Sequence, residues 1–206
     1  MTDLREELLE VIDRRQSDMA LAKRSIFLAK TALQKEMLFR ACTILIYSSL
    51  EGGCKELVSC LLSRVDSAKP CISELSPPFL LLAIGRSCRI GEPVVDIHKK
   101  HRLAEEVRNA MSAPVKMPGS LDLESNLTPK TLHQICQSLK IKYPLNNAGE
   151  KELNSLLLFR NNIAHGDQDM PIDMSRIDRF SGVAQFILVE LASAISECSV
   201  NECWRI

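Results

Sequence analysis

Apolar residues recur at helical spacing along most of the chain. From residue 3 to about 34 they return every three or four positions, with no glycine or proline between them, and this predicts one long amphipathic helix. A second stretch, from about 36 to 65, is almost entirely apolar over residues 37–50 and predicts the central helix of a bundle. Gly52 and Gly53 lie within it, and they predict either the close approach of another helix or a kink.

The second half of the chain has clearer helix boundaries. Thr128 directly before Pro129 is typical of an N-cap followed by the first helical position, and that helix is expected to end near Lys140. Asp173 is the expected N-cap of a final helix. Proline and glycine interrupt residues 66–145, which therefore predict short helices and loops. The remaining helices are expected over Phe79 to about Arg86, Val94 to about Met111, Glu150 to His165, and Asp173 to about Glu197.

These patterns predict an all-α fold. The hydrophobic fraction of 46% is enough for a core, and aromatic residues make up only 4%, so the core is built from aliphatic side chains that favour helices over strands. We expect a single domain over residues 1–206. Its core helices would span about 3–65 and 150–199, and about 66–145 would form an insert.

Composition limits the classes of partner. The chain has 26 basic and 26 acidic residues, so RNA contacts would come from a local patch and not from overall charge. None of the eight cysteines forms a Cys-x-x-Cys pair or a cluster with zinc spacing, and we expect all of them to be reduced in a cytoplasmic protein. No apolar run reaches the roughly 18 residues of a membrane span, so no membrane partner is expected.

Two polar side chains follow the apolar block from Leu153 to Leu158 and the adjoining Phe159. The guanidinium of Arg160 comes next, and its burial would be costly without a partner. His165 follows five residues later, just before Gly166, which occupies the position of a left-handed helix cap. On a regular helix this offset turns the two side chains about 140° apart. They converge on one ligand only if the helix loosens near Gly166, or if a second copy of the chain supplies the missing side chain.

Tyr47 and Glu51 lie four residues apart on one face of the second predicted helix. A carboxylate after so apolar a run needs solvent or a partner. Either Glu51 is partly exposed where the helix emerges, or it pairs with Arg160 and orients it.

An arginine, four residues and then a histidine at the end of an apolar helix, with a polar residue after the arginine, resemble the motif of the HEPN superfamily. Arg160, Asn161 and His165 carry the likeness in this chain. The chain looks most like the MAE-like group of single-domain prokaryotic toxins, which have a similar Tyr and Glu in the second helix. The resemblance implies an HEPN-like helical bundle and a homodimeric, metal-independent endoribonuclease with a toxin–antitoxin or phage-defence role.

The residues suit that chemistry. Cleavage beside a ribose 2′-hydroxyl needs proton transfer and positive charge on the phosphate, but neither a metal nor a cofactor. An imidazole, whose unperturbed pKa is about 6.5, suits the proton transfers, and an arginine fork suits the phosphate. His165 would be the general acid or base and Arg160 the phosphate clamp, with Asn161, Glu51 and Tyr47 in support. The products would be a 2′,3′-cyclic phosphate and a 5′-hydroxyl.

The alternatives are structural or non-catalytic. Arg160 would then pair with a core carboxylate such as Glu51, His165 would cap helix carbonyls, and the protein would be a dimerising RNA- or protein-binding adaptor, or a module that binds small nucleotides. The basic segment His98–Arg102 is either a solvated helix face or a patch that steers phosphate. An antitoxin protein is a further candidate partner. Some antitoxins of HEPN toxins modify a tyrosine two residues after the histidine. Regulation by that route is in doubt here, because Asp167 occupies that position.

Overall fold

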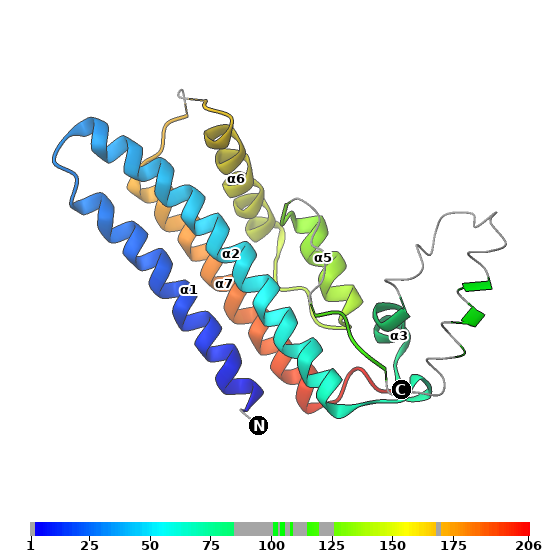
Figure 1. Ribbon diagram of the computed structural model, residues 1–206. Helices are drawn as coiled ribbons and strands as arrows, with labels where there is room; N and C mark the ends of the chain where they lie inside the picture. Colours follow the sequence, from blue (N-terminus) through cyan, green and yellow to red (C-terminus); the bar gives the residue numbers. More distant parts are fainter. Residues whose placement is uncertain are drawn as a thin grey trace.

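A computed structural model describes residues 3–84, 101–102, 104–105, 108, 115–119, 126–167 and 170–206. Its regular elements in these ranges are helices, accompanied by one isolated β-bridge between Leu75 and Arg205. The all-α prediction is therefore confirmed (Figure 1). The elements are α1 (Leu4–Phe27), α2 (Ala32–Ala68), the 3-10 helix η1 (Ile72–Glu74), α3 (Pro77–Ile84), α5 (Pro129–Ser138), α6 (Asn147–Ala164) and α7 (Met174–Val200).

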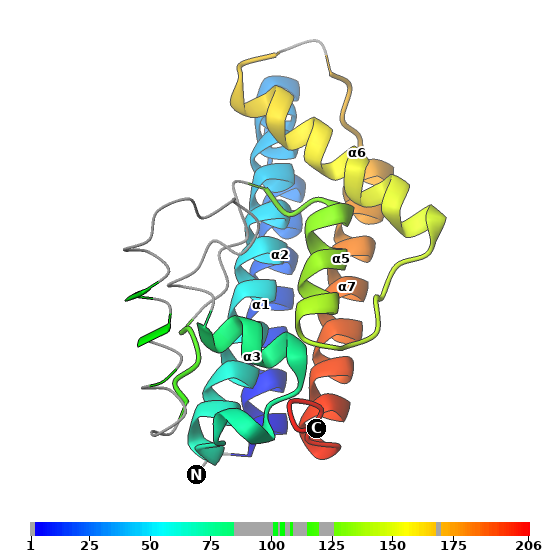
Figure 2. The same ribbon diagram turned by 90° about the vertical axis from the view of Figure 1, so that its right-hand side faces the viewer.

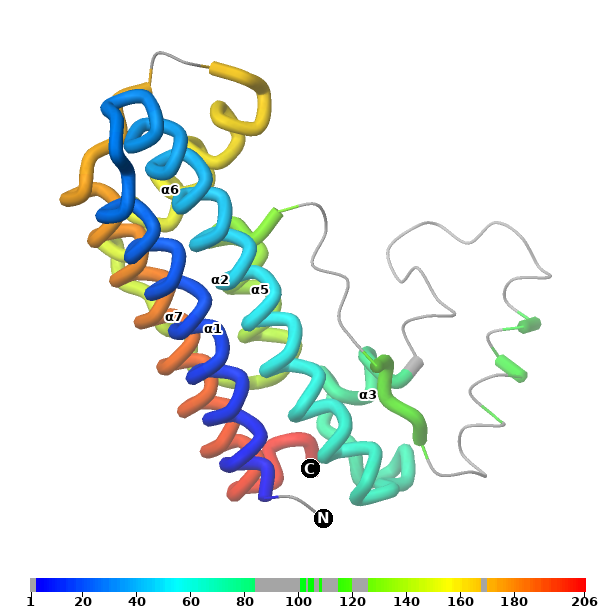
Figure 3. The backbone as a smooth tube through the Cα atoms, turned by 60° about the vertical axis from the view of Figure 1, so that its left-hand side comes forward, coloured from blue at the N-terminus to red at the C-terminus, as the bar shows by residue number. Residues whose placement is uncertain are grey.

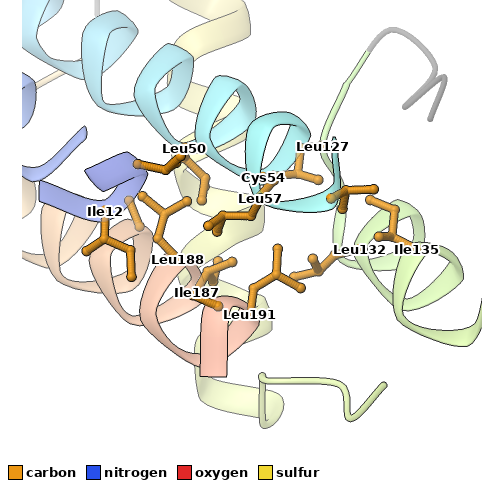
Figure 4. Packing of buried hydrophobic residues seen from close by; sticks show 14 of the residues in the cluster. Ile12, Leu50, Cys54, Leu57, Leu127, Leu132, Ile135, Ile187, Leu188 and Leu191 are labelled. Carbon is orange, nitrogen blue, oxygen red and sulfur yellow. The ribbon is translucent and has the colours of Figure 1, made fainter. Parts of the chain in front are cut away.

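The three long helices α1, α2 and α7 run side by side and form the body of the molecule (Figure 3). Helix α6 packs across α2 and α7 near one end, and α5 lies below it (Figure 2). The core is aliphatic, as the low aromatic content predicts. Figure 4 shows Leu50 and Leu57 of α2 facing Leu188 and Leu191 of α7, and each of these four side chains is fully buried. Burial of this apolar surface is the main favourable contribution to folding.

The prediction of one unbroken helix from residue 3 to 34 is wrong. The first helix ends at Phe27, and the chain turns before α2 begins at Ala32. Thr31 is the N-cap of α2, and its hydroxyl accepts a hydrogen bond from the backbone N–H of Gln34. Because the apolar spacing continues through the turn without a glycine or proline, the periodic pattern conceals the break.

Gly52 and Gly53 allow close packing of α2, and this confirms the first of the two interpretations. A Cβ atom added at Gly53 would lie 2.6 Å from a methyl carbon of Leu188 and 3.2 Å from Cγ of Arg15. One added at Gly52 would lie 2.9 Å from the guanidinium of Arg15. Gly53 therefore lets α1 and α7 approach α2 closely, whereas a side chain at Gly52 would meet only the flexible end of Arg15.

Helix α7 meets the length and composition of a membrane span, with a mean hydropathy of 1.5 over its most apolar window. The expectation that the protein has no membrane partner stays a prediction. The central helix of a folded bundle passes the same test, and 44% of that window is buried inside the protein. Asp173 caps α7 as predicted, accepting a hydrogen bond from the backbone N–H of Arg176 at 2.8 Å.

The chain that follows α7 folds back on the segment before α3. Cys198 and Cys203 form a disulfide, so the expectation that all cysteines are reduced is wrong for this pair. Five others, Cys42, Cys54, Cys60, Cys71 and Cys136, are free. The carbonyl of the buried Trp204 accepts a hydrogen bond from the backbone N–H of Ser76 at 2.6 Å. Cys88 and most of the helix expected over Val94–Met111 lie outside the described residues.

Candidate functional site

Helix α6 brings the motif to the body of the bundle. Its N-cap is Asn146, whose side chain accepts a hydrogen bond from the backbone N–H of Gly149 at 2.9 Å. Leu153, Leu156 and Phe159 form its buried stripe, at spacings of three residues. The ring of Phe159 meets the edge of Phe180 from α7, with the centroids 5.5 Å apart. This packing fixes the rotation of α6 and turns Arg160, the next residue, toward α2.

The end of α6 confirms the predicted left-handed cap. Gly166 has φ +85°, and its N–H donates to the carbonyl of Ile163 at 3.1 Å. The N–H of Asp167 donates to the carbonyl of Asn162 at 3.0 Å, which completes a Schellman motif. The guanidinium of Arg40 on α2 also donates to the Asp167 carbonyl. His165 is therefore held at a defined helix end that is tied to α2.

Arg160 is half-buried and makes three contacts. Its guanidinium lies over the ring of Tyr47 on α2, 4.8 Å from the centroid. Its Nη1 donates to the side-chain oxygen of Asn161 at 2.8 Å and to that of Asn126 at 3.1 Å. The partners come from α2, α6 and the chain that leads into α5. All three are neutral, so they hold the guanidinium without cancelling its charge.

The alternative in which Glu51 pairs with Arg160 is wrong. Glu51 instead accepts from Nζ of Lys55 at 2.6 Å, one helical turn further along α2. Among the residues that the structure describes, no carboxylate forms an ion pair with Arg160, and its remaining guanidinium nitrogens are neither bonded nor buried. These N–H groups face solvent and are open to an anion.

Tyr47 contacts both Arg160 and the backbone of the chain that leads into α5. Its ring is buried, and its hydroxyl accepts a hydrogen bond from the backbone N–H of Leu127 at 2.7 Å. Burial raises the pKa of the Tyr47 phenol, and the adjacent Glu51 raises it further, whereas the Leu127 bond and the charge of Arg160 lower it. Tyr47 and Glu51 thus share one face of α2, as their spacing predicts, and Tyr47 lies between Glu51 and Arg160.

His165 stands apart from this cluster. It is exposed at the C-cap of α6, and its side chain makes no hydrogen bond, ion pair or ring contact within the described ranges. Because α6 stays regular through Ala164, the divergence expected from an offset of five is retained. One chain therefore gathers Tyr47, Asn161 and Arg160 but leaves His165 outside the group. Within the same ranges, no three or more His, Cys, Asp or Glu side chains gather in a way that could hold a metal ion.

Asn126 was not among the residues predicted for the site. This residue lies in a polar loop just before the N-cap Thr128, where an asparagine is ordinary and carries no signal of its own. Its contact with Arg160 spans 34 positions, and only the docking of α5 beside α6 reveals it.

Comparison with known proteins gives the family. A profile of the RiboL-PSP-HEPN family matches residues 4–197, from the start of α1 to within the last turn of α7. The chain belongs to the RiboL-PSP-HEPN family. HEPN domains are helical and are often ribonucleases, so the HEPN resemblance is confirmed and a ribonuclease-type function is suggested. The likeness of this RiboL-PSP-HEPN chain to the MAE-like group stays a prediction. No curated protein and no solved structure matched the chain.

Proposed function

We propose that this RiboL-PSP-HEPN chain is a metal-independent endoribonuclease whose site is built on Arg160 and His165. The observation that carries the proposal is the surroundings of Arg160. A half-buried guanidinium is held by an aromatic face and two amide oxygens, while its other N–H groups face solvent. A structural arginine in such a position is expected to pair with a carboxylate. Here the positive charge is left uncompensated and can serve an incoming phosphate.

The reaction would be an internal transfer within RNA. The ribose 2′-oxygen attacks the adjacent phosphorus, so that the O2′–P bond forms and the P–O5′ bond breaks. A general base takes the 2′ proton, and a general acid gives a proton to the leaving 5′ oxygen. Arg160 would stabilise the charge on the phosphorane oxygens. His165 would carry a proton transfer, and the products would be a 2′,3′-cyclic phosphate and a 5′-hydroxyl.

The single chain supplies only half of this machinery. Two proton transfers are needed, yet one histidine stands at the motif, exposed at the C-cap of α6 and, among the described residues, with no bond to Arg160 or its partners. A two-fold dimer brings the same patch from both subunits together, because an isologous interface is self-complementary. The proposed active form is therefore a homodimer in which the ends of the two α6 helices line one RNA cleft.

The biological setting belongs to the same proposal. A cytoplasmic toxin of the MAE-like type, or a phage-defence effector, would need its cleavage to be controlled by an antitoxin or a trigger. Asp167 stands where a modifiable tyrosine is found in some HEPN toxins. Control by binding fits this chain better than control by tyrosine modification.

The test is digestion of transfer RNA and messenger RNA by purified protein in the presence of EDTA. The wild-type protein should cut single-stranded or looped regions and leave ends with a 2′,3′-cyclic phosphate. Arg160→Ala and His165→Ala should each lose most of the activity. Arg14→Ala, which removes an exposed arginine paired with Glu56 on the α1 face, is the control and should retain it. Cleavage that EDTA abolishes and Mg²⁺ restores would refute the mechanism. RNA that is bound but left intact would indicate an adaptor.

A further inference from the structure

Asn126 is fixed in place before it meets Arg160. Its carbonyl accepts hydrogen bonds from the Thr128 backbone N–H at 3.1 Å and from the Thr131 hydroxyl at 3.2 Å. The next residue, Leu127, is fully buried, and its N–H is bound to the Tyr47 hydroxyl. These backbone contacts do not involve the Asn126 side chain. The side chain is therefore free to serve Arg160, and its oxygen lies 3.1 Å from Nη1.

The chemistry at position 126 is specific. A guanidinium only donates hydrogen bonds, so the amide presents its oxygen to Nη1. Asn161 presents a second amide oxygen to the same nitrogen, and both hydrogens of Nη1 are thereby used. Nη2 and Nε take part in no bond among the described residues and are not buried, so they remain available to a ligand. A carboxylate at position 126 would fit the same space but would form an ion pair with Arg160 at hydrogen-bonding distance.

We propose that Asn126 is a positioning residue of the RNA site. Its amide oxygen fixes the direction of the Arg160 fork, and its neutrality leaves the charge of Arg160 available to one phosphate of the RNA. This proposal rests on the proposed function, since it assumes that Arg160 binds phosphate. It also assigns a role to the chain before α5, which would otherwise be only a connection within the bundle.

The decisive variant is Asn126→Asp, because it replaces an amide by a carboxylate of nearly the same shape. The matched control is Asn146→Asp. It makes the same chemical change at the N-cap of α6, where aspartate is an equally good cap and lies at the far end of the helix from Arg160. Asn126→Ala tests the loss of the hydrogen bond without a new charge. Thermal unfolding of each variant checks that the fold is retained.

Binding is measured with a mixed-sequence 2′-O-methyl RNA oligonucleotide, which lacks the free 2′-hydroxyl and cannot be cut, over a range of salt concentrations. Asn126→Asp should bind at least tenfold more weakly than wild type. Its plot of log affinity against log salt should be shallower by about 0.7, the contribution of one phosphate contact on a single strand. On cleavable RNA, KM should rise. Asn126→Ala should keep the salt slope but lose kcat, because the fork is no longer directed. Asn146→Asp should match the wild type throughout.

Two failures are distinguishable. If the wild type binds and cuts RNA and Asn126→Asp does so with the same affinity and salt slope, the positioning role is refuted and the proposed function stands. If Asn126→Asp loses affinity with an unchanged salt slope, the effect is structural and the positioning role is likewise refuted. If the wild type neither binds nor cuts any RNA, the proposed function is refuted, and the role of Asn126 falls with it.

Discussion

The guanidinium of Arg160 lies over the ring of Tyr47, with 4.8 Å between the central carbon and the ring centroid. The ring supplies an attractive surface without hydrogen-bonding capacity, so the N–H groups of Arg160 remain free to point sideways and outward. The Tyr47 hydroxyl faces the other way and receives the N–H of Leu127. One side chain of α2 thus supports two different segments.

These two functions of Tyr47 can be separated by mutation. Tyr47→Phe keeps the ring beneath Arg160 but leaves the buried Leu127 N–H without its acceptor, which should lower the free energy of unfolding by about 1–3 kcal/mol. Tyr47→Leu also removes the ring face and should cost more. RNA cleavage should fall further in Tyr47→Leu than in Tyr47→Phe. Urea unfolding followed by circular dichroism measures the first effect, and equal stability of Tyr47→Phe and wild type would show that the bond contributes nothing.

Two glycines in long helices should respond in opposite ways to alanine. Gly53→Ala places a Cβ atom 2.6 Å from a methyl carbon of Leu188 and should destabilise the protein by about 1–3 kcal/mol. Gly182→Ala has nothing within 4 Å of the new atom and should stabilise α7 by about 0.5–1 kcal/mol, since alanine is the better helix former. Denaturant midpoints measure both. A neutral Gly53→Ala would mean that α1 and α7 adjust more easily than this packing suggests.

Stability should decrease above about pH 9. Burial raises the pKa of the Cys42 thiol from about 9 to about 11, and burial likewise raises the pKa of Cys136 to about 11. Between these values the unfolded chain loses the thiol protons and the folded protein keeps them. The folded state then binds more protons, so the free energy of unfolding decreases as the pH rises from about 9 to about 11. Urea unfolding measures the free energy of unfolding of the wild type and of the double variant Cys42→Ala/Cys136→Ala across this pH range. The free energy should decrease less with rising pH in the double variant than in the wild type.

The composite site predicts complementation between two inactive proteins. Arg160→Ala and His165→Ala homodimers each lack one component, whereas a mixed dimer holds one Arg160 and one His165. After subunit exchange, a mixture should show weak cleavage above either parent. Exchange is followed with differently tagged subunits, and the matched control mixes Arg160→Ala with Arg160→Ala/His165→Ala. Confirmed exchange without recovered cleavage, or an active protein that sediments as a monomer, would contradict the shared site.

The sequence predicts helix ends well where they carry local chemistry. Thr128 with Pro129 and Asp173 mark starts that the structure confirms, and Gly166 marks a confirmed end, because caps are made within a few residues of each other. The turn after Phe27 escaped prediction because apolar residues occupy it. Its sign in the sequence was Thr31 followed three residues later by Gln34, the spacing of a capping box, and the Gln34 N–H indeed donates to the Thr31 hydroxyl.

The site could be predicted only in part. Arg160 and Asn161 are neighbours in the motif, and Tyr47 follows from helical spacing together with the resemblance. The partner of Glu51 could not be predicted, since Lys55 on the same helix and Arg160 on another helix are both plausible, and only packing decides between them. Asn126 depends entirely on how α5 docks, and a sequence read locally does not contain that information.

The side chains that hold Arg160 in place come from segments far apart in the sequence. Its bond to Asn126 spans 34 positions, and the supporting bond from Leu127 to Tyr47 spans 80. Contacts of such long range form late in folding, because the entropy of closing the intervening loops must be overcome first. A chain that has folded only part of the way therefore has no ordered phosphate clamp. In the proposed ribonuclease, this order of events would delay RNA cleavage until the bundle is complete and would spare the cell from incompletely folded copies.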